Sequence, residues 1–399
     1  MSGSRGYSPE ARDDGAAFRA CIAPLALLTS IFYLNFTGRI VLAPLLGAVE
    51  RDLHISHSEA GSFFFFLSAG YFLSLVLSGL VSKRLAHRGT VILSASLVGA
   101  ALLGVALSRD IGEMRGAMFL LGAAAGLYLP SGISTVTGLV RRRDWGKALG
   151  IHELAPNLAF LSAPLIAQAI LSTCSWRVAP ALLGGLSLVL AVAFKRFGKG
   201  GRSAGTAPGK DAVLALVKTP RFWLMAGVFS VGITGTLGVY TMLPLYLSTE
   251  AGLTEAGANT LVGLSRSLSL GMALVAGYGA DRLGARRTMG VVFAVNGAAT
   301  ILLGVASGVL LKVMVFLQPA VAVCFFPAGF VALSRVGPPE ARNVAVSLTV
   351  PLGFLIGGGA VPYAIGAMGD LHTFAAGMVG AGFLILSGSI LAWFVADSE

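Results

Sequence analysis

The chain has 399 residues, of which 55% are hydrophobic and only 12% are charged. Soluble domains carry about 25% charged residues, so a water-soluble fold could not bury this much apolar surface. A net charge of +11 would suit a nucleic-acid partner, but the basic residues lie in short polar stretches between apolar runs and not on one face. Composition therefore predicts an integral membrane protein and gives no reason to invoke nucleic acid.

The apolar residues come in runs of about 20, which is the length that crosses a hydrocarbon core of about 30 Å. In chain order, the predicted spans of the first half are 21–49, 61–81, 90–108, 116–140, 148–171 and 178–194. Those of the second half are 222–247, 256–280, 288–310, 313–334, 344–368 and 374–395. We expect an all-α membrane protein with about twelve transmembrane helices in two six-helix bundles, 21–194 and 222–395. A linker, 195–221, joins the bundles, and short tails, 1–20 and 396–399, flank them.

The orientation follows from the basic residues. Placing both termini in the cytoplasm also places most of the 29 Lys and Arg residues there. The basic residues on the opposite side are then Arg51, Arg109, Arg115, Arg177 and Lys312. The positive-inside rule therefore predicts a multi-pass protein of the bacterial inner membrane, with lipid around it and both termini cytoplasmic.

The two halves repeat short patterns at a nearly constant spacing. A hydroxyl cap followed by a helix start opens the second span at 58–61 and the eighth span at 254–257. Three further residues of the first half, Gly79, Arg84 and Arg88, recur in the second half as Gly277, Arg282 and Arg286. Parallel six-helix repeats are a recurring transporter architecture, with the substrate site near the midplane where the halves meet.

The stretch 277–287, GYGADRLGARR, resembles the loop signature G-x-x-x-D-R-x-G-x-[RK]-[RK] of the major facilitator superfamily. The resemblance implies the major facilitator fold and a gating role for five residues, Gly277, Asp281, Arg282, Gly284 and Arg286. A basic loop that only sets topology is the alternative. The first-half copy departs from the signature, because Lys83 stands where the acid belongs and Ala86 where the second glycine belongs.

Two arginines lie within predicted spans, where a charge costs about 2.5 to 3.5 kcal/mol. Arg266 lies near the middle of the eighth span and Arg39 in the outer half of the first. A guanidinium is a rigid fork that matches a carboxylate, phosphonate or sulfonate, so we expect a small anionic ligand. The placement is similar to that in monocarboxylate, oxalate and nitrate carriers for Arg266, and in organic-anion and sugar-acid symporters for Arg39. Pairing with a buried acid or with helix carbonyls is the alternative for each.

Other polar side chains within the spans are candidates to complete the substrate cavity, although ordinary helix–helix hydrogen bonding explains each one at least as well. They are Tyr33, Asn35, Tyr71, Tyr128, Asn157, Tyr240 and Gln318.

An adjacent titratable pair, His152 and Glu153, lies just inside the cytoplasmic edge of the fifth span. A buried carboxyl or imidazole can load and release a proton, so we expect proton coupling here, with Glu153 preferred and His152 second. A conformational latch to basic cytoplasmic loops is the alternative.

These features predict a secondary transporter that moves a small organic anion, with a carboxylate as the expected charged group, in symport with protons. The alternative is a proton-coupled drug or metabolite exporter, but the central parts of the first four spans hold no Asp or Glu. The sequence has no HExxH, GxSxG or GxxxxGK[ST] motif, and its three cysteines show no CxxC spacing. We expect no enzyme activity, no cofactor and no metal, and a monomer.

Overall fold

The structure is a computed structural model that describes residues 18–206, 209–336 and 342–395. Within these ranges, the side chains at 210, 212, 273, 274, 277, 280, 281 and 342–344 are not described. Most of the predicted N-terminal tail, and the predicted C-terminal tail at 396–399, lie outside the described residues.

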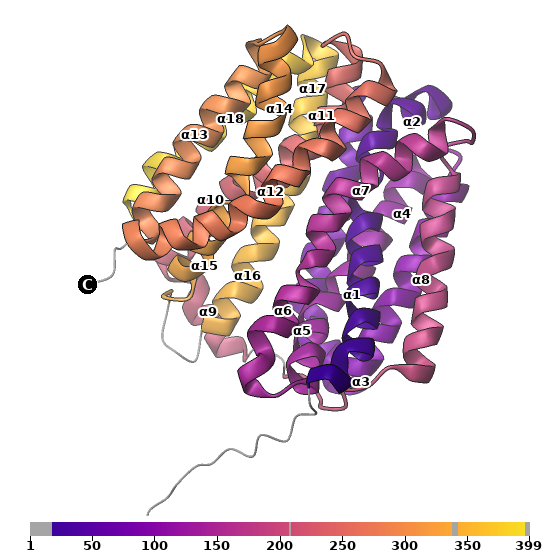
Figure 1. Cartoon of the computed structure of the whole chain (residues 1–399), viewed down its shortest axis with the longest axis vertical. Helices are drawn as coiled ribbons and strands as arrows, with labels where there is room; N and C mark the ends of the chain where they lie inside the picture. The colour runs from indigo at the N-terminus through magenta and orange to yellow at the C-terminus, as the bar shows by residue number, and fades with distance from the viewer. Residues whose placement is uncertain (1–17, 207–208, 337–341, 396–399) are drawn as a thin grey trace, which may run out of the picture.

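The N-terminal bundle contains helices α1 to α8 (Figure 1). Their bounds are α1 Phe18–Ile40, α2 Leu46–Leu53, α3 His57–Leu107, α4 Ile111–Gly126, α5 Tyr128–Leu139, α6 Trp145–His152, α7 Leu154–Leu171 and α8 Val178–Phe197. Short 3-10 turns cover Ala43–Leu45 and Arg142–Asp144. A short helix, α9 Lys210–Val217, follows in the linker.

The C-terminal bundle lies beside the first, as the orange-to-yellow helices of Figure 1 show. Its helices are α10 Pro220–Ile233, α11 Val239–Thr249, α12 Glu255–Leu283, α13 Ala285–Val305, α14 Gly308–Ala322, α15 Phe325–Leu333, α16 Arg342–Leu355, α17 Val361–Leu371 and α18 Phe374–Trp393. Two π-helical turns, Thr234–Gly238 and Ile356–Ala360, interrupt the seventh and eleventh spans.

The helix lengths agree with the predicted number of spans. Ten helical stretches in the described chain are long and apolar enough to cross a membrane. One of them, α3, has 51 residues, or about 77 Å at 1.5 Å per residue, so it supplies two crossings, with non-helical backbone at Ala86 between them. With the 29-residue α12, the architecture of about twelve transmembrane helices in two bundles is confirmed.

Prolines explain three breaks within spans. Proline has no N–H to donate to the carbonyl four residues earlier. That carbonyl belongs to Gly126 for Pro130, to His152 for Pro156 and to Val323 for Pro327. The breaks between α4 and α5, α6 and α7, and α14 and α15 fall at these positions.

The linker packs on the N-terminal bundle. Arg88 Nη2 donates to the carbonyl of Lys195 (3.0 Å) and Arg88 Nη1 to that of Gly198. The backbone N–H groups of His87 and Arg88 donate to the carbonyls of Ser203 (3.1 Å) and Gly201 (2.7 Å). The linker therefore covers the kink of α3.

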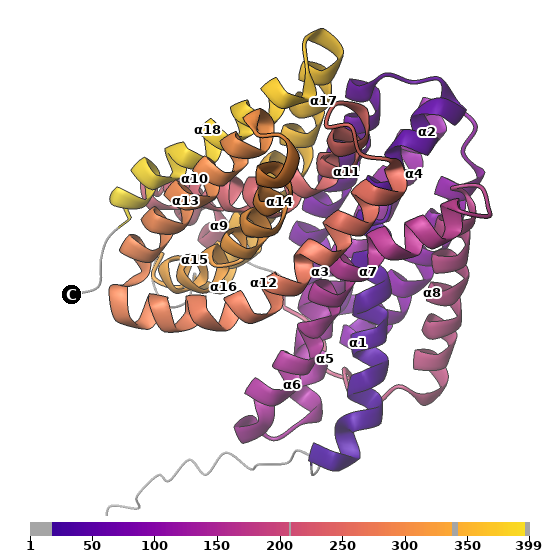
Figure 2. The ribbon, with the colours of Figure 1, turned by 45° about the horizontal axis from the view of Figure 1, so that its top comes forward.

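Side chains form hydrogen bonds across the boundary between the two bundles. In the described chain, these bonds lie at the end of the molecule opposite the linker. Asp370, at the end of α17, accepts the backbone N–H groups of His57 (2.9 Å) and Ser58 (2.8 Å) at the start of α3. Arg51 of α2 pairs with Glu255 of α12. Asn259 donates to the carbonyl of Pro44 (3.2 Å). This end of the molecule is closed, and Figure 2 shows α2, α11 and α17 gathered there.

Candidate functional site

Both membrane arginines are buried. The exposed fractions of Arg39 and Arg266 are 4% and 6%. Arg39 lies in the last turn of α1, and Arg266 lies about three turns into α12. Each bundle thus contributes one buried guanidinium group.

Arg39 is enclosed by aromatic rings. Its guanidinium carbon lies 4.1 Å from the centroid of Tyr71 in α3 and 5.0 Å from that of Phe36, one turn earlier in α1. A third ring, Phe354 of α16, lies 4.9 Å away and belongs to the opposite bundle. Arg39 therefore faces the boundary between the two bundles.

Arg266, like Arg39, lies against aromatic rings of both bundles. Its guanidinium carbon lies 4.5 Å from the centroid of Phe160 in α7, across the boundary, and 4.6 Å from Tyr240 in α11. Its Nη2 donates to the carbonyl of Thr236 (3.3 Å), within the first π-helical turn. A π-helical turn shifts backbone pairing and often occurs at functional sites, and here it presents a carbonyl to the guanidinium.

A row of rings joins the two arginines. Phe160 contacts both Phe36 (5.1 Å between centroids) and Tyr240 (4.9 Å), each in an edge-to-face arrangement. We call this group the arginine–aromatic cluster; its members are Phe36, Arg39, Tyr71, Phe160, Tyr240, Arg266 and Phe354. The cluster draws on α1, α3 and α7 of one bundle and on α11, α12 and α16 of the other.

Several polar groups of the cluster are unsatisfied. The Nε atoms of Arg39 and Arg266 and the hydroxyl of Tyr240 are buried without a hydrogen-bond partner. In the described part of the chain, neither guanidinium pairs with a carboxylate. Buried charges in proteins are normally paired, so these groups can receive an anion with acceptor oxygens in the guanidinium plane.

Three of the other predicted cavity residues hydrogen-bond within their own bundle. Tyr33 Oη lies 2.7 Å from Ser162 Oγ in α7, and Asn35 Nδ2 donates to the carbonyl of Ala125 in α4 (3.3 Å). Asn157 Nδ2 donates to the carbonyl of Glu153, one turn earlier (3.0 Å). None of the three contacts a member of the arginine–aromatic cluster in these interactions.

Gln318 belongs to a separate polar network within the C-terminal bundle. Its Nε2 donates to the carbonyl of Gly235 (2.7 Å), in the same π-helical turn that serves Arg266, and to Asn296 Oδ1 (3.0 Å). Asn296 in α13 did not figure among the residues expected from the sequence. The network fixes the shape of the π-helical turn, because it satisfies the carbonyl next to the one that Arg266 uses.

The two residues of the predicted proton-coupling pair, His152 and Glu153, differ in burial. The side chain of His152 is fully buried, whereas that of Glu153 is 54% exposed, with 3.5 Å between Nδ1 and Oε1. His152 stacks on Phe32 (4.5 Å between centroids), and its Nε2 lies 3.0 Å from Tyr128 Oη. Tyr128 Oη donates to the carbonyl of Leu28 (2.8 Å), so Nε2 of His152 is the donor to Tyr128 and Nδ1 is left as the acceptor in the neutral ring.

The predicted gating motif lies at the turn between α12 and α13. The guanidinium of Arg282 lies over Tyr278 (4.6 Å) and that of Arg286 over Trp393 (5.2 Å). Gly284 has φ 80°, in the region that favours glycine. Gly277 and Asp281 lie in α12, and their side-chain contacts are not described.

Sequence reasoning missed three rings of the cluster, Phe36, Phe160 and Phe354. Phe36 precedes Arg39 by three positions, so helical spacing places both on one face, and that signal was available. Phe160 and Phe354 come from other helices whose rotation the sequence does not fix.

Two six-helix membrane bundles with a buried polar site at their boundary define a protein of the membrane-transporter class. The sequence of residues 25–295 matches the model of the Major Facilitator Superfamily. The chain belongs to this superfamily.

Curated relatives are distant. The chain is 25% identical over 189 residues to MFS-type transporter 1 of Pyricularia oryzae, covering 46% of this chain and 30% of that protein. It is 26% identical over 242 residues to Protein TsgA of Escherichia coli O157:H7, covering 59% of this chain and 61% of that protein. The chain thus spans from about a third to three fifths of the length of these relatives.

Solved structures share the fold over nearly the whole chain. A bacterial homolog of the human lysosomal transporter Spinster, in an inward-facing and occupied conformation, superposes with a TM-score of 0.78 at 15% identity and covers 96% of this chain and 97% of that one. The nucleoside transporter NupG superposes with a TM-score of 0.74 at 15% identity, covering 93% and 98%. At these identities the similarity shows the fold alone.

Proposed function

We propose that this protein is a secondary active transporter that carries a small organic anion, with a carboxylate as its charged group, by alternating access of the two bundles and in symport with protons. The observation that carries the proposal is the pair of buried guanidinium groups, Arg39 and Arg266, which have no carboxylate partner in the described chain.

The energetics support an anionic ligand. Desolvation of an unpaired charge is costly, and rings beside Arg39 and Arg266 offset only part of that cost, by about 0.5 to 2 kcal/mol for each contact. A carboxylate in the guanidinium plane supplies two charge-assisted hydrogen bonds. The site is then more stable with the anion than without it.

The position of the arginines supports alternating access. Arg39 and Arg266 belong to different bundles, and each contacts a ring of the opposite bundle. An anion that is bound by both arginines favours the arrangement that brings the bundles together, because a ligand shifts a conformational equilibrium by its difference in affinity for the two states.

For the proton step, burial favours His152 over Glu153, which reverses the order expected from sequence alone. The Nδ1 of His152 is buried without a hydrogen-bond partner, so it offers a protonation site inside the bundle, while Glu153 is half-exposed. The alternative of proton-coupled drug export expects a carboxylate in the centre of the first or fourth span, and neither α1 nor residues 116–140 contain Asp or Glu.

Uptake of a panel of radiolabelled carboxylates into proteoliposomes, with and without an inward proton gradient, tests the proposal. We expect one or more carboxylates to accumulate under the gradient and Arg266→Gln to abolish that accumulation. Arg115→Gln is a matched control, because Arg115 lies near the membrane surface at the start of α4. Uptake of no carboxylate, or equal uptake by Arg266→Gln, would refute the proposal.

A further inference from the structure

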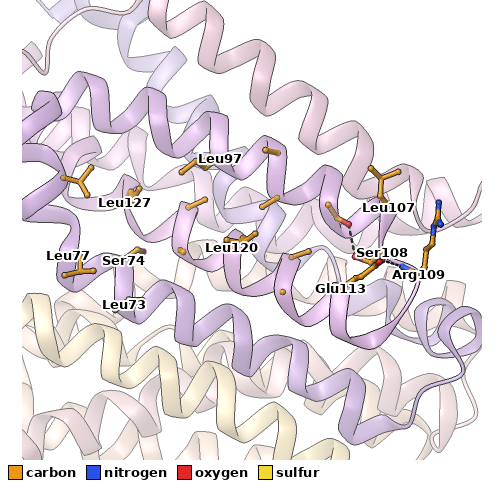
Figure 3. A pocket seen from close by; sticks show the side chains of 18 residues that line it. Leu73, Ser74, Leu77, Leu97, Leu107, Ser108, Arg109, Glu113, Leu120 and Leu127 are labelled. Carbon is orange, nitrogen blue, oxygen red and sulfur yellow. Dashed lines mark hydrogen bonds between the residues drawn. The ribbon is translucent and has the colours of Figure 1, made fainter.

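An apolar groove lies on the N-terminal bundle, between the two limbs of α3 and over α4 (Figure 3). Its volume is about 900 Å³. Leucines such as Leu73, Leu97 and Leu120 form its sides and remain 47%, 44% and 60% exposed. Small residues, including Gly104 and Gly116, line it as well and leave the space that larger side chains would fill.

One end of the groove is charged, and Figure 3 shows Arg109 and Glu113 there. Glu113 Oε2 accepts the backbone N–H of Arg109 (2.8 Å), which holds this carboxylate at the start of α4. The guanidinium of Arg109 is exposed and has no hydrogen-bond or ion-pair partner in the described chain. This end lies at the turn between α3 and α4, on the side of the membrane opposite the linker.

The groove is long enough for a lipid chain. Its lining residues in α4 and at the residue that follows it extend from Glu113 to Leu127, which is about 21 Å along a helix. One leaflet of the hydrocarbon core is about 15 Å deep, so the groove crosses a full leaflet from the charged end inward. An apolar, bilayer-facing groove of this depth is filled by hydrocarbon and not by water.

We propose that the groove binds one acyl chain of a phospholipid with an amine-bearing, zwitterionic head group, with the phosphate on Arg109 and the ammonium beside Glu113. This site is separate from the arginine–aromatic cluster and goes beyond the proposed transport function. Charge complementarity selects the head group, because a phosphate suits the free guanidinium of Arg109 and an ammonium suits the carboxylate of Glu113.

Photolabelling tests whether the chain lies in the groove. The full-length protein is reconstituted with phosphatidylethanolamine that carries a photoreactive group on its acyl chain, and the labelled peptides are mapped. A Cβ at Gly116 meets nothing within 4 Å, so Gly116→Leu fills the groove without a clash. Gly185→Leu in α8 is the matched control, because Gly185 is equally open and does not line the groove.

We expect the label to concentrate on the groove segments of α3 and α4 in the wild type and in Gly185→Leu. In Gly116→Leu we expect labelling of these segments to fall about tenfold, as for the loss of one well-fitted chain contact. Equal labelling of Gly116→Leu, or label spread evenly over the outer helices of both bundles, would overturn the proposal.

A competition measurement tests the head group. Unlabelled phosphatidylethanolamine should displace the label about tenfold more effectively than unlabelled phosphatidylglycerol, as expected for the one charge contact, with Glu113, that phosphatidylglycerol cannot make. Glu113→Gln should remove the preference for phosphatidylethanolamine, whereas Arg109→Gln should weaken displacement by both lipids, because both carry the phosphate. Equal displacement by the two lipids in the wild type, or an unchanged preference in Glu113→Gln, would refute the assignment of the head group.

Discussion

Ala86 and Gly284 hold the same rare backbone conformation at equivalent turns of the two bundles. Ala86 has φ 55° and ψ 170°, and Gly284 has φ 80° and ψ 157°. Only glycine adopts this region without strain, and another residue there costs about 1 to 3 kcal/mol. The repeat in the sequence therefore reflects a repeated turn, and the N-terminal bundle holds that turn with an unfavourable residue.

Replacing Ala86 by glycine should stabilise the protein. Relief of the strain should outweigh the added entropy of glycine in the unfolded chain and raise the free energy of unfolding by about 1 kcal/mol. Gly284→Ala should lower the free energy of unfolding by about the same amount. Thermal unfolding in detergent measures both changes.

The control is Gly290→Ala in α13, where the added Cβ meets nothing within 4 Å. It should raise stability slightly, because alanine favours a helix over glycine by about 1 kcal/mol. If Gly284→Ala and Gly290→Ala have effects of the same sign, the shared turn is not the cause.

The π-helical turn beneath Arg266 should depend on Gly235. A Cβ there would lie 2.3 Å from Asn296 Nδ2, so Gly235→Ala should displace Asn296 and break its hydrogen bond with Gln318. We expect Gly235→Ala to lower the free energy of unfolding by about 1 to 3 kcal/mol, which is the cost of leaving a buried polar group without a hydrogen bond. In the control Gly227→Ala, the Cβ lies 3.7 Å from Leu391, which is an ordinary contact. This variant should leave the free energy of unfolding unchanged. Equal thermal stabilities of the two variants would contradict the role of the network.

The closed end of the molecule should depend more on Asp370 than on Arg51. Asp370 accepts two backbone N–H groups at the N-terminus of α3, where a carboxylate contributes about 1 to 2 kcal/mol. The Arg51–Glu255 pair is 65% and 38% exposed, and such pairs contribute about 0 to 1 kcal/mol. Asp370→Ala should therefore shift the population toward opening at this end more than Arg51→Gln does.

Spin labels on cysteines at positions 145 and 223, in place of Trp145 and Trp223, report this shift. Both positions are exposed and lie near the linker end, in different bundles. Asp370→Ala should enlarge the fraction with a short distance between the labels. An unchanged distribution would show that Asp370 does not hold the closed state.

The assignment of the proton step predicts opposite results for neighbouring residues. His152→Gln should abolish stimulation of uptake by a proton gradient but retain exchange of anion for anion, because the ring that takes the proton is lost while the arginines remain. Glu153→Gln should retain most of the stimulation, since its side chain is 54% exposed. The reverse pattern would restore Glu153 as the coupling residue.

Much of the fold could be predicted from the sequence. The apolar runs locate the spans, but prolines alone do not locate the breaks within them, because Pro24 and Pro164 lie inside unbroken helices. The continuous α3 and the π-helical turns could not be predicted, because they depend on packing between distant helices. The linker's contacts with Arg88 were missed for the same reason.

The candidate site was predicted only in part. Arg39 and Arg266 stood out because a charge inside a span is costly, and Tyr71 and Tyr240 do contact them. These helices carry apolar residues on every face, so the sequence does not reveal which face of each helix points to the boundary between the bundles. Asn35 and Gln318 therefore looked equivalent to Tyr71 and Tyr240, although they bond within their own bundles.

In the proposed transporter, Arg39 and Arg266 hold the same anion. Equilibrium binding of the best transported carboxylate to purified wild type, Arg39→Gln, Arg266→Gln and the double variant tests this shared binding. We predict that each single variant loses at least about tenfold in affinity, as for one charge-assisted contact, and that the two losses do not add in the double variant. Wild-type affinity in either single variant, with both variants folded, would contradict shared binding.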